Sequence, residues 1–201
     1  MARLNKSILL CALLLSAAEP AHAVVYFTLG GSQSQNNVGQ SYLSRAGSAS
    51  VAVDLGEYFR VGITHRQEFS ENQGYVEYRT QKGQYYLSPG TTHVVANSVD
   101  LTVILYNGDT FVPFIQGGLV RKDYDFEVTK EDESGQVIVE EGQATQGPVP
   151  SIGAGVGIKL NRNFSLKLSY VASPGYVTMP DGELAAKIDT YTQIGITYQI
   201  Q

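Results

Sequence analysis

Apolar and polar residues alternate one by one over eight stretches of the chain. Alternation with a period of two is the pattern of a β-strand, because successive side chains of a strand point to opposite faces. The eight predicted strands cover residues 25–30, 48–55, 59–64, 98–105, 111–120, 151–160, 164–170 and 193–200. The two faces of the fifth strand, 111–120, are hard to distinguish, and no helix is predicted between the strands.

The connections between these strands alternate in length. Short links are predicted at 54–57, 107–110 and 161–163. The second contains Asn107-Gly108, a tight-hairpin signal because both residues tolerate positive φ. Long polar segments are predicted at 33–45, 70–92, 122–149 and 173–187. Short turns at one end and long loops at the other are typical of an outer-membrane β-barrel.

The apolar face of each strand fits the side of such a barrel that meets lipid. About four outward residues at roughly 3.4 Å per residue and about 40° of tilt cover about 20 Å, close to the roughly 25 Å apolar band of these barrels. Aromatic residues gather beside the short links, where an interfacial girdle is expected. They are Tyr58, Phe59, Tyr106, Phe111, Phe164 and Tyr198.

The alternative is a soluble lipocalin-like barrel, which would point its apolar residues inward around a ligand. Five charged residues share the polar face with Ser, Thr and Gly: Arg60, Asp100, Lys159, Lys167 and Asp189. A cup holding these charges would bind a hydrophobic ligand poorly. The pattern therefore favours the membrane barrel, with the polar face around a narrow lumen.

The first 23 residues read as a secretory signal peptide. Arg3 and Lys6 precede a short apolar run at 7–16, and Ala21-His22-Ala23 matches a small-residue cleavage site. We expect residues 24–201 to form one outer-membrane β-barrel domain. Cys11 lies in the apolar run after Leu10, which makes it a poor lipoprotein attachment site.

Composition removes several classes of function. The formal net charge is −5 and no basic run occurs, which argues against nucleic-acid binding because phosphates are bound by Lys/Arg clusters. A single Cys excludes a disulfide scaffold and a cysteine-based zinc site. No cofactor or metal site is predicted.

Two segments carry a resemblance to a known family. Gly195-Ile196-Thr197-Tyr198-Gln199-Ile200 is similar to the closing-strand signal read by the barrel-assembly machinery, with Gly195, Tyr198 and Ile200 at its key positions. Residues 112–118, Val-Pro-Phe-Ile-Gln-Gly-Gly, are similar to a Pro-aromatic-x-x-Gly-Gly strand. The mature chain thus resembles the small eight-stranded outer-membrane barrels of OmpA, OmpX and opacity-protein type. Ile200 in place of Phe and the extra Gln201 depart from the usual signal.

Charged residues on the polar face are the first candidate site. Side chains alternate between the two faces of a strand, and we call a residue's place in this alternation its parity. By parity these residues point into the barrel: Arg60, Lys159 and Lys167 low, near the short links, Asp100 near the middle, and Arg66, Glu68 and Asp189 near the top, at the long loops. One interpretation is a selective ion path. The other is a plug of salt bridges and hydrogen bonds that fills the narrow lumen.

His65 is the second candidate, because it breaks the apolar face of 59–64 together with Gln67 and Asn97. The strands could protrude from the bilayer there, or His65 could contact lipopolysaccharide headgroups or serve a lipid-modifying site. A His base needs a Ser within reach. Ser70 has the opposite parity and His93 is no better placed, so no catalytic site is predicted.

Two long segments are candidate surface-ligand sites. In 122–149, alternation on both sides of Glu133-Ser134-Gly135 predicts a hairpin rich in carboxylates, which could serve adhesion by strand pairing, bind a cation, or remain a solvated edge. In 70–92, tyrosines with nearby basic residues could bind a ligand or cap the barrel mouth; they are Tyr75, Tyr78, Tyr85 and Tyr86 beside Arg79 and Lys82.

The sequence therefore predicts an integral protein of the cell outer membrane of a Gram-negative bacterium. Its role would be structural, surface interaction or adhesion through the loops, without catalysis. Expected partners are outer-membrane lipid and lipopolysaccharide, and the assembly machinery during biogenesis. A narrow channel for ions or small solutes is the main alternative, and a lipid-modifying enzyme is a further one.

Overall fold

The computed structural model describes residues 24–36, 42–72, 76–80, 83–131, 137–178 and 184–200. The predicted signal peptide lies outside these residues. The strands are β1 (Val25–Asn36), β2 (Tyr42–Asp54), β3 (Phe59–Asn72), β4 (Val76–Thr80), β5 (Gly83–Ile104), β6 (Phe111–Glu131), β7 (Val137–Lys159), β8 (Phe164–Thr178) and β9 (Leu184–Ile200). No helix that could cross a membrane occurs in these ranges.

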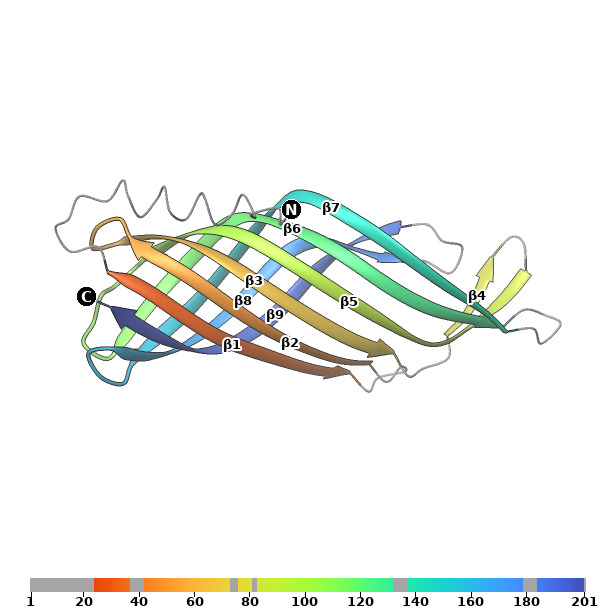
Figure 1. Cartoon of the computed structure of the whole chain (residues 1–201), viewed down its shortest axis with the longest axis horizontal. Coiled ribbons are helices and arrows are strands. Elements are labelled where there is room, and N and C mark those ends of the chain that lie inside the picture. The colour runs from red at the N-terminus through yellow and green to blue at the C-terminus, as the bar shows by residue number, and fades with distance from the viewer. Residues whose placement is uncertain are drawn as a thin grey trace, which may run out of the picture.

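Eight of the strands form a closed antiparallel barrel (Figure 1). Each strand pairs with its neighbours in chain order, β3 pairs with β5, and β1 closes the barrel against β9 from Val25↔Ile200 to Gly31↔Ile194. The short strand β4 pairs with β5 alone, beyond the barrel wall. This confirms the predicted eight-stranded up-and-down barrel.

The two ends of the barrel differ, as the link lengths predict. The links 55–58, 105–110 and 160–163 lie at one end, here called the short-turn end, which is at the left in Figure 1. The short link that contains Asn107-Gly108 does not use the positive φ that both residues tolerate: among the described glycines a positive φ occurs at Gly56, with φ 120°. Gly108 instead provides space, since a Cβ there would lie 2.6 Å from the Tyr106 ring.

Apolar side chains cover the outside of the barrel, as predicted for a membrane barrel and contrary to a lipocalin-like one. Exposed examples from different strands are Leu29, Leu101, Ile115, Ile152 and Ile196. At the short-turn end, the six predicted girdle aromatics are all at least 40% exposed. We call this outer surface the apolar belt.

Parity also resolves the two faces of the fifth predicted strand. Phe111, Ile115 and Leu119 are exposed on the outside, whereas Val112, Phe114 and Gln116 line the interior.

The predicted long loops are largely wrong in extent, because the strands continue through them. The β2–β3 ladder reaches Tyr42↔Asn72, and the β6–β7 ladder reaches Glu131↔Val137. Backbone hydrogen bonds do not require an apolar face, so pairing persists where the alternation of side chains ends. The hairpin predicted within 122–149 is confirmed, and its strands are continuous with the barrel wall. Segment 70–92 contributes the β4–β5 hairpin.

Candidate functional site

A cavity of about 1260 Å³ runs along the inside of the barrel. Asn107 and Arg162 line it at the short-turn end, and Thr92 and Phe126 at the opposite, long-loop end. The seven charged residues that parity assigns to the lumen all contribute to its lining: Arg60, Arg66, Glu68, Asp100, Lys159, Lys167 and Asp189. Side chains therefore do not pack the interior solid, and the charges lie in separate layers along it.

At the short-turn end three side chains form a bonded group in the lumen. Arg60 Nε lies 2.8 Å from Asp54 Oδ1, and the guanidinium carbon lies 3.4 Å from the centre of the Tyr26 ring. The Tyr26 hydroxyl donates to Asp54 Oδ2 at 2.5 Å. Lys159 lies apart from this group and donates from Nζ to Asn107 Oδ1 at 3.0 Å.

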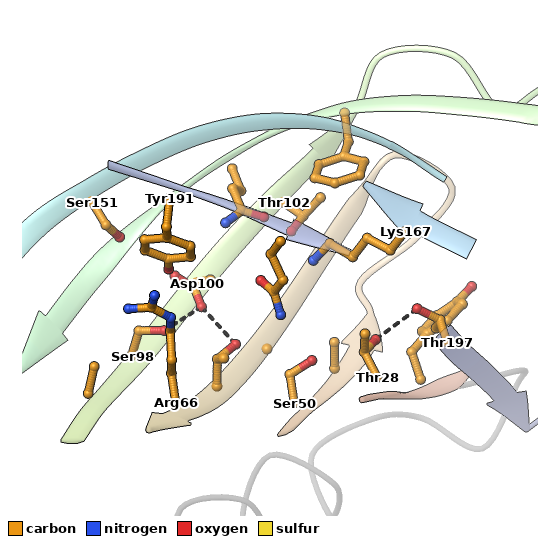
Figure 2. A pocket seen from close by; sticks show the side chains of 18 of the residues that line it. Thr28, Ser50, Arg66, Ser98, Asp100, Thr102, Ser151, Lys167, Tyr191 and Thr197 are labelled. Carbon is orange, nitrogen blue, oxygen red and sulfur yellow. Dashed lines mark hydrogen bonds between the residues drawn. The ribbon is translucent and has the colours of Figure 1, made fainter. Parts of the chain in front are cut away.

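The middle layer contains Asp100 and Lys167, which form no ion pair with each other (Figure 2). Asp100 Oδ2 accepts hydrogen bonds from Ser98 Oγ at 2.7 Å and Thr64 Oγ1 at 3.2 Å. Lys167 extends into the pocket, with its ammonium 5.1 Å from the centre of the Phe114 ring. Two opposite charges thus face the cavity from separate strands, β5 and β8.

Nearer the long-loop end, Arg66 and Glu68 are brought together. Arg66 Nη1 lies 2.6 Å from Glu68 Oε2, and its guanidinium carbon lies 3.9 Å from the centre of the Tyr191 ring. Ser44 Oγ donates to the other Glu68 oxygen at 2.6 Å. Figure 2 shows Arg66, Tyr191 and Asp100 on the same side of the pocket.

The most buried ion pair of the lumen joins Asp189 to Lys122, a residue that the sequence reasoning missed. Lys122 Nζ lies 2.7 Å from Asp189 Oδ2 and donates to the backbone oxygen of Pro174 at 2.9 Å. The sequence pattern places Lys122 at the start of a predicted loop, although it is separated from Phe114 and Val120 by an even number of positions and so shares their face of the strand. Extending the fifth strand by two residues would have placed it inside the barrel.

Tyr26 and Asp54 were also not singled out, although both lie on polar faces of predicted strands. Their role depends on the register of β1 against β2, which the sequence pattern leaves open. No group of three or more potential metal-ligating side chains occurs within the described ranges.

His65 lies on the outside of the barrel with the two residues that share its polar break. Its Nδ1 is 2.9 Å from Asn97 Oδ1, and its Nε2 is 3.1 Å from Gln67 Nε2. Ser70 is buried on the inner face and donates to the backbone oxygen of Thr92. His65 and Ser70 therefore lie on opposite faces of β3, and this pair has no catalytic geometry.

The remaining sequence candidates lie partly beyond the described residues. In segment 70–92, Tyr75 and Lys82 are outside them, and nothing is described of the side chains of Tyr78, Arg79, Tyr85 and Tyr86. In the closing strand, Tyr198 and Ile200 point outward and Gly195 is buried on the inner face.

Comparison with known proteins identifies a fold and no family. No protein-family model matches the chain, and no curated protein matches it. The attachment invasion locus protein Ail of Yersinia pestis, in complex with the heparin analogue sucrose octasulfate, matches with a TM-score of 0.50 and 13% identity, over 89% of this chain and 99% of that one. CarO of Acinetobacter baumannii matches with a TM-score of 0.46 and 9% identity, over 86% and 96%.

At this level of identity the likeness to Ail establishes architecture alone. The chain has the fold of the small eight-stranded outer-membrane β-barrels.

Proposed function

We propose that this protein is an integral outer-membrane barrel that displays the β6–β7 hairpin at the cell surface as a binding element for other proteins. The apolar belt would contact lipid, with the short turns in the periplasm and the long-loop end outside. Arg45, His65, Asn97 and Arg121 lie along the outer edge of the belt, where they would meet lipopolysaccharide headgroups. Gly195, Tyr198 and Ile200 would form the signal read by the assembly machinery.

The observation that carries this proposal is the length of the β6–β7 hairpin. Arg121 is the first charged residue on the outer face of β6, yet the ladder continues to Glu131↔Val137. Ten further residues of β-strand span roughly 34 Å along the strand. A paired sheet of this length projects rigidly from the barrel, whereas an unpaired loop would lose much entropy on binding.

The hairpin has chemistry suited to an extended, basic segment of a partner. Strand β7 pairs with β6 along one edge, and its other edge pairs with β8 only from Ile152 to Lys159. Between Val137 and Ser151 this second edge has no strand partner within the described ranges. Such an edge can add a strand through backbone hydrogen bonds. Carboxylates of the hairpin would select basic side chains: Glu141 on β7, and Asp123, Asp125 and Glu127 on the adjacent strand β6. Asp123 also lies 3.5 Å from Arg121 and accepts a hydrogen bond from Thr145. The four carboxylates would repel a polyanion of the kind bound to Ail in its complex with sucrose octasulfate.

The test uses the barrel in lipid nanodiscs and a biotinylated peptide of alternating Val and Lys. We expect the peptide to bind and its affinity to fall with added salt. A peptide of the same sequence with N-methyl groups at alternate residues cannot pair as a strand, so we expect it not to bind. Equal binding of both peptides would refute recognition through the strand edge.

Two variants separate the hairpin from the rest of the barrel. Asp123→Asn/Asp125→Asn/Glu141→Gln should weaken binding and reduce its salt dependence. Replacing 128–140 by Asn-Gly, which favours a two-residue hairpin turn, should abolish binding. The shortened barrel should retain its heat-dependent gel mobility, because the apolar belt and all eight barrel strands remain.

A second candidate function is a narrow pore, favoured by the cavity that extends from Arg162 to Phe126. The Arg60, Asp54 and Tyr26 group lies in this path, so we expect ions and small solutes to be the species that pass. In planar bilayers we expect small, steady conductance steps that increase in Arg60→Ala and stay unchanged in Arg121→Ala, whose side chain is outside. Absence of steps from folded wild-type protein would exclude the pore.

A further inference from the structure

The wall of the barrel is incomplete between β7 and β8. Their ladder runs from Lys159↔Ser165 to Ile152↔Ala172 and stops there. The N–H of Leu160 donates to Phe164 O, and donors alternate along a strand, so even-numbered residues of β7 and β8 exchange hydrogen bonds. The next such pair is Pro150 and Pro174. Neither has an N–H, so the ladder cannot continue through this position. We call this opening in the ladder the β7–β8 seam.

The seam begins inside the apolar belt. Ile152 is the last residue of β7 that pairs with β8, and on its other side it pairs with Gly117 of β6. Along the outer face of β6, Leu119 and then the charged Arg121 follow Gly117. The side chains beside the seam are apolar and exposed: Ile152 is 70%, Tyr170 53% and Ile188 73% exposed. Lipid chains rather than water would therefore surround the part of the seam that lies next to Ile152.

The cavity lies directly behind the seam. Ser151 and Ser173, which would face each other if the ladder continued by one pair, both line it. Five apolar side chains of β5, β6 and β7 line the cavity from this level toward the long-loop end, and we call this wall the apolar compartment: Val94, Ala96, Val120, Phe126 and Ala144. Ser70, Thr92 and the Lys122–Asp189 pair line the same part of the cavity. On the short-turn side, Arg66, Tyr191 and Asp100 form a polar layer. The apolar wall of the cavity thus adjoins an opening in the ladder that faces the belt.

One side chain fastens the seam from inside. Pro174 O belongs to the pair that the ladder cannot form, and it accepts a hydrogen bond from Lys122 Nζ, which also pairs with Asp189. The β9–β1 ladder ends at Ile194↔Gly31, so the far part of the β8–β9 hairpin has no backbone partner on either side in the described ranges. It is held across the lumen by Lys122, by Arg66 against Tyr191, and by the Gln193–Ser48 hydrogen bond.

We propose that the β7–β8 seam is a lateral entrance through which a single acyl chain passes between the surrounding lipid and the apolar compartment of the lumen, with Lys122 as its latch. The exposed apolar flanks and the apolar wall of β5, β6 and β7 favour a hydrocarbon chain over a polar solute, and the missing backbone bonds leave the two strands unjoined there. This inference rests on the proposed membrane placement. It is independent of the hairpin's partner.

The test exploits the absence of Trp from the chain. Tyr124→Trp places a reporter in the apolar compartment, because Tyr124 is buried and lines the cavity. Tyr170→Trp places a Trp reporter on the outer apolar belt. Tyr26→Trp places a Trp reporter in the polar lumen at the short-turn end, beside Arg60. In nanodiscs of phosphatidylcholine with brominated acyl chains, we expect bromine to quench the emission of Trp at 170 and at 124 but not at 26, compared with unbrominated discs.

A reversible lock tests the route. In the Tyr124→Trp, Cys11→Ser background, the disulfide formed by Ser151→Cys/Ser173→Cys should abolish quenching, and reduction should restore it. The matched control is Lys159→Cys/Ser165→Cys, a pair of the same parity where the ladder is intact, and it should change nothing. Lys122→Met should increase quenching, because the latch is removed.

The outcomes separate the two proposals. Unquenched Trp at 170 would refute the membrane placement, whereas quenched Trp at 170 with unquenched Trp at 124 would refute the seam alone. A second arm adds 12-bromododecanoic acid to unbrominated discs. The acid could quench Trp at 124 while the 151–173 disulfide is formed, with no quenching by brominated lipid under any condition. Acyl chains would then enter the lumen through its open long-loop end, and the lateral entrance would be refuted.

Discussion

Asp100 fits into the lumen because the residue opposite it on β6 is a glycine. The two residues are register partners, and a Cβ on Gly118 would lie 2.2 Å from Val99 O and 2.6 Å from Asp100 Oδ1. Gly118→Ala should therefore destabilise the barrel by about 1–3 kcal/mol through overpacking. Gly117→Ala is the matched control, since its Cβ would meet only Ser151 O at 3.8 Å. Guanidinium unfolding in detergent micelles measures both, and equal midpoints would contradict the steric argument.

Asp100 itself should also matter for stability. Asp100→Ala removes the acceptor of both the Ser98 and the Thr64 hydroxyl, and it takes away a carboxylate that acts electrostatically on Lys167. We expect a lower unfolding midpoint in the same assay. An unchanged midpoint would indicate that water solvates this carboxylate fully.

Lys122 and Asp189 offer a test of coupling between two buried charges. Removing one partner of such a pair leaves the other uncompensated, so Lys122→Met should cost about 3–5 kcal/mol of unfolding free energy. Lys122→Met/Asp189→Leu should cost less than the single change. Lys159→Met, at an exposed lumen position, should have little effect. Additive costs in the double variant would show that the two side chains act independently.

The alternation of side chains along each strand was the feature of the sequence that best predicted which residues face the lumen. It assigned Arg60, Asp100 and Lys167 to the polar face because each lies within an unbroken alternating run. It does not reach Lys122, because the alternating run ends at Val120, and it does not pair Arg60 with Asp54, because pairing depends on register. Contacts between strands are set by backbone hydrogen bonds, which alternation along one strand does not encode.

At the scale of elements, two prolines decide where the barrel wall ends. Pro150→Val/Pro174→Val would restore both N–H groups at the next hydrogen-bonded pair of β7 and β8. The ladder should then extend beyond Ile152↔Ala172, which predicts slower amide hydrogen exchange at residues 150–153 and 172–175. Each single substitution restores one donor and should give a smaller effect. Unchanged exchange in the double variant would mean that something other than the prolines keeps the strands apart.

The lengths of the strands were not predictable from their side chains. Alternation ends near Thr64 in β3 and near Val120 in β6, yet the strands continue to Asn72 and Glu131. Beyond the apolar belt both faces of a strand meet polar surroundings, so no periodic pattern is required there. The hairpin in 122–149 was nevertheless predictable, because its own residues alternate around Glu133-Ser134-Gly135.

At the scale of the whole molecule, the barrel is closed by its two terminal strands. The sequence predicted this closure from eight repeats of one weak signal and from the alternation of short and long links. The ladder from Val25↔Ile200 to Gly31↔Ile194 is the joint between the first and last strands. Closure makes unfolding cooperative, because opening this joint exposes two strand edges and the polar lumen to lipid or detergent at the same time.

This cooperativity predicts heat-dependent migration on denaturing gels. Unboiled protein from outer-membrane fractions should stay folded in the detergent and migrate differently from boiled protein. Deleting residues 195–201 removes the β9 side of the joint and should abolish the difference, because the remaining strands cannot close. Shortening the hairpin by replacing 128–140 should preserve it, since these residues lie beyond the closed part of the barrel. Identical migration of boiled and unboiled wild-type protein, recovered in the soluble periplasmic fraction, would refute a membrane barrel.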